Sequence, residues 1–151
     1  MFKELRKRIM VFANSVDELD QSRELALAKT SLQKAMMWSG NYLKFTDSGD
    51  NPYANNGSRE TVADIEPMFD KTEAAISGDN PVIVVDNLRE LIDEARKEVL
   101  EFSLKRPGAS EASDEIMQYF IVISIIQHLM ESRMWLGMEL GRMRDEAAIK
   151  A

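Results

Sequence analysis

Two segments of this chain, 97 positions apart, repeat one pattern of large residues. Leucine, methionine, tryptophan, glycine and leucine coincide when residues 32–43 are placed over residues 129–140. The two tryptophans of the sequence, Trp38 and Trp135, fall at equivalent positions. Chance similarity between two amphipathic helices is the alternative, but matching positions of rare residues favour a duplication. A duplicated helical hairpin would give a pseudo-twofold four-helix arrangement from one chain.

The spacing of apolar residues predicts that both repeats are helical. In the first repeat, residues suited to a helix core recur at steps of three and four positions: Leu25, Ala28, Leu32, Ala35, Ser39 and Leu43. We expect a shorter helix over residues 2–13 before this one, and a helix over residues 82–105 before the second repeat. The expected fold class is therefore all-α, with two related helical hairpins forming a four-helix arrangement and a long loop with a short helix between them.

Turn-forming residues divide the chain between the hairpins. Residues 44–81 carry three basic residues against eight acidic ones and are rich in Gly, Asn, Asp and Pro. The expected domains are a first helical hairpin over 1–45, an acidic turn-rich connector with a short helix over 46–81, and a second helical hairpin over 82–151. Ser15 and Glu18 have the S-x-x-E spacing of a capping box, which predicts that the first long helix begins at Val16.

The last helix, expected from Ser113 to about Ala147, is apolar on almost all sides between residues 116 and 130. Such a helix normally lies at the centre of a bundle or in a subunit interface. The sequence also contains ten methionines, whose flexible side chains suit adaptable contacts. We therefore expect a homo-oligomer.

Composition excludes several classes of function. The sequence has no cysteine and one histidine, His128, so thiolate metal sites, disulfides and histidine pairs within one chain are excluded. A net charge of −7 argues against binding to a DNA or RNA polymer. The longest apolar run, residues 119–126, is too short to span a membrane, and the charged N-terminal segment does not resemble a signal peptide. We expect a cytoplasmic protein with no membrane partner.

A helical face rich in carboxylates leaves one enzymatic alternative open. Acidic side chains recur along the third expected helix at Glu90, Asp93, Glu94, Glu98 and Glu101. All-α nucleotide pyrophosphohydrolases hold Mg²⁺ with such residues, but they need acidic pairs on facing helices. The last helix offers only Glu131 and Glu139 in its middle part, and basic residues interleave with the acids. We therefore expect no metal, no cofactor and no catalytic residue.

One segment resembles a known family. Residues 28–33, with the sequence Ala-Lys-Thr-Ser-Leu-Gln, are followed by Met36, Met37 and Trp38. This pattern resembles the core helix of the phage cyclic-nucleotide sponge family, the helical-hairpin proteins that counter CBASS and Thoeris immunity. The resemblance covers about twenty of the 151 residues. The chain departs from the family by its second hairpin and its acidic connector, and Ile126 and Gln127 replace Lys29 and Thr30 in the second repeat.

The resemblance implies that the chain is not an enzyme and that it sequesters a cyclic di- or trinucleotide immune messenger. Lys29 and Arg23 would offset phosphate charge, Thr30 would donate a hydrogen bond, and Trp38 and Tyr53 would stack on bases. Gln33 completes this candidate ligand site. The residue pattern itself favours the other reading: Trp38, in its Met-rich neighbourhood, as an anchor of a core or an interface, and Tyr53 as an exposed loop residue. The alternative function is a self-assembling helical interaction protein without a small ligand.

Overall fold

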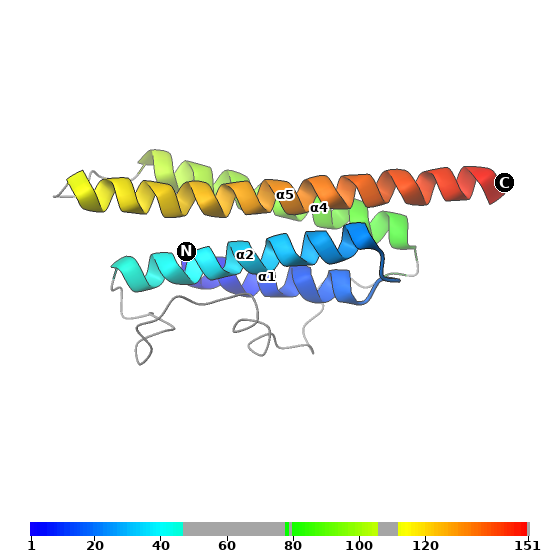
Figure 1. The fold of residues 1–151 in the computed structure, drawn as a ribbon, viewed down its shortest axis with the longest axis horizontal. Coiled ribbons are helices and arrows are strands. Elements are labelled where there is room, and N and C mark those ends of the chain that lie inside the picture. Colours follow the sequence, from blue (N-terminus) through cyan, green and yellow to red (C-terminus); the bar gives the residue numbers. More distant parts are fainter. Residues whose placement is uncertain (47–77, 79, 106–111, 151) are drawn as a thin grey trace.

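The computed structural model describes residues 1–46, 78, 80–105 and 112–150. It contains the helices α1 (Phe2–Asp17), α2 (Arg23–Thr46), α4 (Pro81–Lys105) and α5 (Ala112–Lys150) (Figure 1). All regular structure in these ranges is helical, which confirms the all-α fold class. Tyr53 and the short helix expected in the connector lie outside the described residues, so the division into domains stays a prediction.

The helices form two antiparallel hairpins, α1 with α2 and α4 with α5, and the hairpins pack through α2 and α5 (Figure 1). The α2–α5 contact is the most extensive of the bundle, and α1 and α4 touch only slightly. Helices α2 and α5 run in opposite directions, as the colours in Figure 1 show. Helix α5 extends along one long side of the molecule and beyond α2 at both ends.

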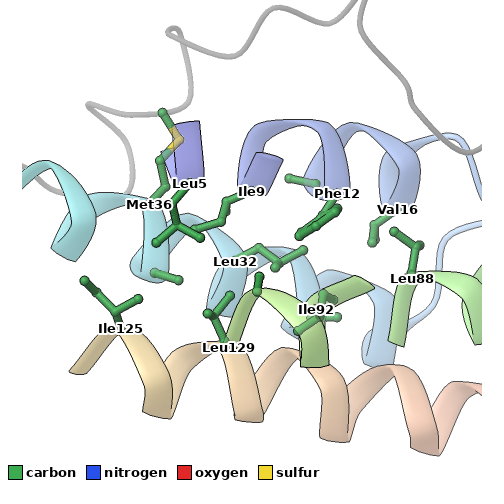
Figure 2. Close-up of a cluster of buried hydrophobic side chains, with 14 of the residues drawn as sticks. Leu5, Ile9, Phe12, Val16, Leu32, Met36, Leu88, Ile92, Ile125 and Leu129 are labelled. Carbon is green, nitrogen blue, oxygen red and sulfur yellow. The ribbon is translucent and has the colours of Figure 1, made fainter. Parts of the chain in front are cut away.

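Apolar side chains from all four helices meet in one core (Figure 2). Each helix contributes residues at steps of three, four or seven, as one helix face requires. The labelled members are Leu5, Ile9, Phe12 and Val16 of α1, Leu32 and Met36 of α2, Leu88 and Ile92 of α4, and Ile125 and Leu129 of α5. Full burial of each such side chain stabilises the fold by about 1.5–3 kcal/mol. This burial stabilises the helices, because short-range interactions alone would not keep them folded.

The pattern of burial agrees with the internal repeat. Seven pairs of residues related by the offset of 97 positions are buried in both long helices. The buried pairs are Leu25 and Val122, Ala28 and Ile125, Leu32 and Leu129, Ala35 and Ser132, Ser39 and Leu136, Tyr42 and Glu139, and Leu43 and Leu140. Since α2 and α5 are antiparallel neighbours, this equivalence gives the bundle an approximate twofold relation between its hairpins.

The expected start of the first long helix at Val16 is wrong. Helix α1 continues to Asp17, and the Ser15 hydroxyl donates a hydrogen bond to the Val11 carbonyl inside that helix at 2.9 Å. Ser15 is fully buried, so continuation of the apolar face of α1 outweighs the local capping signal. The cap of α2 is Ser22, whose hydroxyl accepts a hydrogen bond from the Leu25 N–H at 3.2 Å.

Helix α4 begins as its sequence dictates. The Asn80 side-chain oxygen accepts a hydrogen bond from the Val82 N–H at 3.1 Å, and Pro81 occupies the first helical position. The β-branched residues that follow favour strands, but burial of Val84 and Val85 against the core keeps this segment helical. Helix α5 continues three residues beyond the expected end, to Lys150.

Candidate ligand-binding surface

A cavity of about 720 Å³ lies where the end of α2 meets the beginning of α5. Helix α2 contributes Trp38, Asn41 and Lys44 to its lining, and α5 contributes Ile116, Met117, Phe120 and Ile121. This volume is within the range of sites for small organic ligands, roughly 300–1,000 Å³. The lining is mostly apolar, with one amide and one ammonium group on the α2 side.

The two aromatic rings of the cavity hold each other in place. The rings of Trp38 and Phe120 are 5.6 Å apart between centroids and meet edge to face at 78°. This contact fixes the orientation of Trp38 without covering it completely, since both side chains remain partly exposed. An indole face, an amide and a cation in one cavity can stack on a base, bind its polar edge and offset a phosphate.

Lys29 and Thr30 do not line this cavity. The Lys29 ammonium group lies 2.8 Å from a carboxylate oxygen of Asp17, at the end of α1. The Thr30 hydroxyl donates to the Ala26 carbonyl one turn earlier at 3.1 Å. Thr30 is nevertheless partly exposed and lies eleven residues before Asn41, a spacing that places both on one face of α2. Thr30 therefore lies on the face of α2 that leads to the cavity, whereas Lys29 pairs with α1.

The remaining predicted site residues are spread along α2. The Arg23 guanidinium lies 6.0 Å from the ring centroid of Trp135, at the opposite end of α2 from Trp38. Fifteen residues of helix separate the two, or about 22 Å. Gln33 is buried, with 4% of its surface exposed. The structure thus brings neither Arg23 nor Gln33 into the cavity with Trp38, and Tyr53 lies outside the described residues.

The approximate twofold relation extends to both tryptophans. Adding 97 to Trp38 gives Trp135, and adding 97 to Arg23 gives Phe120. Trp38 contacts Phe120, and Trp135 contacts Arg23, so the same pair of positions meets at both ends of the α2–α5 contact. One end therefore has an aromatic pair beside a cavity, and the other has a cation over an indole ring.

Sequence reasoning missed most of the cavity. Asn41, Lys44 and the α5 residues 116, 117, 120 and 121 were not among the predicted ligand-binding residues. The repeat alone did not indicate Phe120, because its contact with Trp38 depends on where α5 crosses α2. The helical face through Thr30, by contrast, leads to Asn41, and Lys44 lies one turn further along α2.

Glu131 lies at the middle of the α2–α5 contact and joins the two helices. Its Oε2 atom accepts a hydrogen bond from the Ser31 hydroxyl of α2 at 3.5 Å and lies 3.1 Å from Nδ1 of His128. Its Oε1 atom accepts a hydrogen bond from the Gln127 amide at 3.3 Å. These contacts give His128 a structural partner at the helix contact rather than a nucleophile to activate.

Two carboxylates of the acidic face of α4, Asp93 and Glu98, form ion pairs. Hydrogen bonds from Arg96 and Lys97 hold the pKa of Asp93 below its usual value of 3.8. Glu98 forms an ion pair with Arg8 of α1. Within the described ranges, no three acidic or histidine side chains lie close enough together to hold a metal ion. No helix in the described part of the chain combines the length and hydropathy of a membrane span.

Residues 1–41 match the family model described as Acb2/Tad1, hairpin domain, which is the phage cyclic-nucleotide sponge family. This match confirms the resemblance carried by residues 28–38. It covers α1 and most of α2, including Trp38 and Asn41 of the cavity lining. Searches of the curated proteins and of the solved structures gave no match.

Proposed function

We propose that this chain, which begins with an Acb2/Tad1 hairpin domain, sequesters a cyclic di- or trinucleotide immune messenger of the host cytosol and does not hydrolyse it. The observation that carries this proposal is the cavity beside Trp38, on the helix that belongs to the matched domain. Its lining combines the group types that a cyclic nucleotide requires, and its volume suits a compact ligand.

The cavity assigns a role to each polar or aromatic residue on its α2 side. The Trp38 indole stacks on a base, and the Asn41 amide binds a base edge or a sugar hydroxyl. The Lys44 ammonium offsets the charge of a phosphodiester. Thr30 lies on the same face of α2, closer to its middle, and contacts the ligand only if the ligand extends beyond the cavity. Arg23 and Gln33 lie too far away or too deeply buried to join this contact.

The described part of the cavity lining agrees with capture without reaction. Phosphodiester hydrolysis requires an activated nucleophile and stabilisation of the charge that develops on phosphorus oxygens. Among the described lining residues there is no histidine and no carboxylate pair for a metal. The proposal therefore expects the ligand to leave unchanged when the protein unfolds.

The test is a capture-and-release experiment. The protein is mixed with a panel of cyclic di- and trinucleotides, filtered free of unbound ligand and heated, and the released nucleotides are separated by chromatography. Recovery of one intact messenger supports the proposal. Recovery of a cleaved product in the presence of Mg²⁺ would identify a hydrolase, and no capture of any panel member would leave the self-assembling interaction protein as the function.

Variants locate the site. Trp38→Leu and Lys44→Ala should each raise the dissociation constant about tenfold or more, as loss of a stacked base or a charged hydrogen bond does. Matched controls are Trp135→Leu, at the repeat-equivalent position, and Lys7→Ala, an exposed lysine of α1; both should bind as the wild type does. The double variant Lys29→Ala, Thr30→Ala tests whether the ligand extends along α2. If only this double variant weakens binding, and Trp38→Leu and Lys44→Ala do not, the binding site lies away from the cavity.

A further inference from the structure

The outward face of α5 has a continuous apolar stripe between residues 116 and 138. The stripe consists of Ile116, Phe120, Ile123, Met130, Met134 and Met138, with Gln127 at its centre, and its six apolar side chains are 41–71% exposed. Steps of three and four keep these residues on one side of the helix, opposite the buried face that includes Leu129. Soluble monomers rarely expose an apolar patch of this extent, so the stripe indicates a partner.

We infer that the partner is a second copy of this chain, whose α5 packs antiparallel along the same stripe. Exposed Met117 and Tyr119 flank the stripe, so eight large apolar side chains are available to a partner. Each half-exposed side chain has on the order of 100 Å² of accessible surface. Together the eight side chains offer roughly 800 Å², the area that each partner contributes to an interface of standard size. Length and area therefore fit a helix as long as α5 itself.

The order of residues along the stripe is self-complementary in an antiparallel pairing. With the twofold axis at Gln127, Ile116 faces Met138 of the other copy and Phe120 faces Met134. Ile123 then lies beside Met130. Each contact joins a rigid branched or aromatic side chain to a flexible methionine, which can adapt to its shape and pack its sulfur against an aromatic ring.

Gln127 gives this pairing its register. It is the polar residue on the line of the stripe, and the two copies of its amide meet at the axis, where each can donate to the other. A single polar residue within an apolar helix seam specifies register and orientation, because any shift leaves it buried without its partner. In a parallel pairing, each residue of the stripe would face the same residue of the other copy. Ile116 and Phe120 would then pair with Ile116 and Phe120, and the methionines with methionines, so rigid side chains would not be matched with flexible ones.

The pairing also concerns the cavity, because Ile116 and Phe120 belong to both the stripe and the cavity lining. Met134 and Met138 of the second copy would border the α5 side of the cavity and exclude water from it. This consequence rests on the proposed function. The self-association itself does not, since it is measured on the protein without ligand.

Self-association is tested by light scattering and sedimentation of the ligand-free chain. The wild type should have twice the chain mass of 17.2 kDa. Met134→Lys should reduce it to a monomer with unchanged helicity by circular dichroism, because each lysine would be buried against Phe120 of the other copy without a partner for its charge. Ile149→Lys is the matched control: this side chain is 85% exposed on the same helix, beyond the stripe, and its variant should remain a dimer. A monomeric wild type would overturn the inference and leave the stripe to another molecule.

Cysteine cross-linking tests the register and stays decisive if Met134→Lys fails to fold. The chain has no cysteine of its own, so each introduced thiol is the only one. Gln127→Cys should form a disulfide between copies on mild oxidation, because the α-carbons of equivalent residues at the axis come within roughly 4.4–6.8 Å of each other. Ile149→Cys should not cross-link above background. Cross-linking at residue 149 without cross-linking at residue 127 would refute the antiparallel pairing, whatever the result of messenger capture.

Discussion

Glu139 links the middle of α5 to the beginning of α2 and provides a quantitative test of the fold. Of the acidic side chains that the structure describes, it alone is completely buried. Its Oε2 atom accepts hydrogen bonds from the Ser22 hydroxyl at 2.8 Å and from Arg142 Nε at 3.1 Å, and a second Arg142 nitrogen contacts Oε1. Because the Ser22 hydroxyl also caps α2, Glu139 stabilises the turn between α1 and α2 from the opposite hairpin.

The perturbation is Glu139→Gln, which keeps the volume of the side chain and removes its charge. The amide oxygen can still accept from Ser22, but the amide N–H₂ group then faces a guanidinium that also only donates. A hydrogen bond to a charged group contributes about 1.5–3 kcal/mol, so we expect a loss of about 2 kcal/mol in the free energy of unfolding. Breaking a fully buried ion pair would reduce the free energy of unfolding by more than this. The loss is smaller here because Arg142 is 40% exposed and remains solvated. The melting temperature should fall by about 4–8 °C.

The pH dependence of this loss has a defined sign. Burial alone would raise the pKa of Glu139, but hydrogen bonds from Arg142 and Ser22 outweigh it and hold the pKa below the usual 4.5. A group with a lowered pKa in the folded state stabilises the protein above its usual pKa, and this contribution is lost as the pH falls toward the folded pKa. The difference in stability between wild type and Glu139→Gln should therefore be full at neutral pH and shrink as the pH falls below 4.5.

Urea unfolding followed by circular dichroism measures both effects. Glu146→Gln is the matched control, because Glu146 pairs with the same arginine on the exposed surface and should contribute little. In a double-mutant cycle with Ser22→Ala, the two changes should not be additive, since the side chains share a hydrogen bond. The reasoning is refuted if Glu139→Gln is no less stable than Glu146→Gln, or if its loss of stability is the same at every pH.

Four further substitutions test the core, the helix glycines and the surface of α4, each by urea unfolding. Leu129→Ala removes a fully buried side chain and should reduce the free energy of unfolding by about 3 kcal/mol; a loss below about 1 kcal/mol would contradict its place in the core. Gly141→Ala should stabilise α5 by about 0.5–1 kcal/mol, since an added Cβ meets no described atom within 4 Å, whereas Gly137→Ala should gain less because its Cβ would lie 3.2 Å from the Arg89 guanidinium. Asp93→Asn should remove part of the acid sensitivity: the lowered pKa of Asp93 means that its stabilisation is present above pH 3.8 and is lost below it, so the wild type should lose stability more steeply than the variant as the pH falls through that value.

Apolar spacing predicted the helices because it reports a long-range requirement, the burial of one face. The steps through Leu25, Leu32 and Leu43 corresponded to buried residues throughout, and the equivalent positions in α5 are buried as well. Short-range signals were less reliable. The sequence has a capping motif at Ser15, but no helix begins there. Ser15 is instead buried within α1, and the helix continues through that position.

The candidate site was predicted less well, and the reason is geometric. A sequence motif gives the spacing of residues along one helix, whereas a cavity is formed by two. Of the residues that the resemblance implied, Trp38 lines the cavity, whereas Lys29 and Arg23 do not and instead contact Asp17 and Trp135. Lys44 and Phe120 were absent from the prediction because their contribution depends on where α5 crosses α2.

The repeat explains how one bundle can carry both proposed surfaces. Packing constrains the buried positions of both hairpins equally, because each faces the other across the approximate twofold relation. The outward positions of α2 and α5, which are at least partly exposed, lie outside the core, so substitutions there disturb it less. At four equivalent outward positions the residues differ in character: Arg23 and Phe120, Thr30 and Gln127, Lys34 and Glu131, and Asn41 and Met138. The first hairpin has the cationic and hydrogen-bonding members that suit an anionic ligand. The second has the aromatic ring and the thioether, which suit an apolar contact with another helix. Divergence of the outward faces on a shared core would therefore allow one hairpin to bind the messenger and the other to bind a second copy.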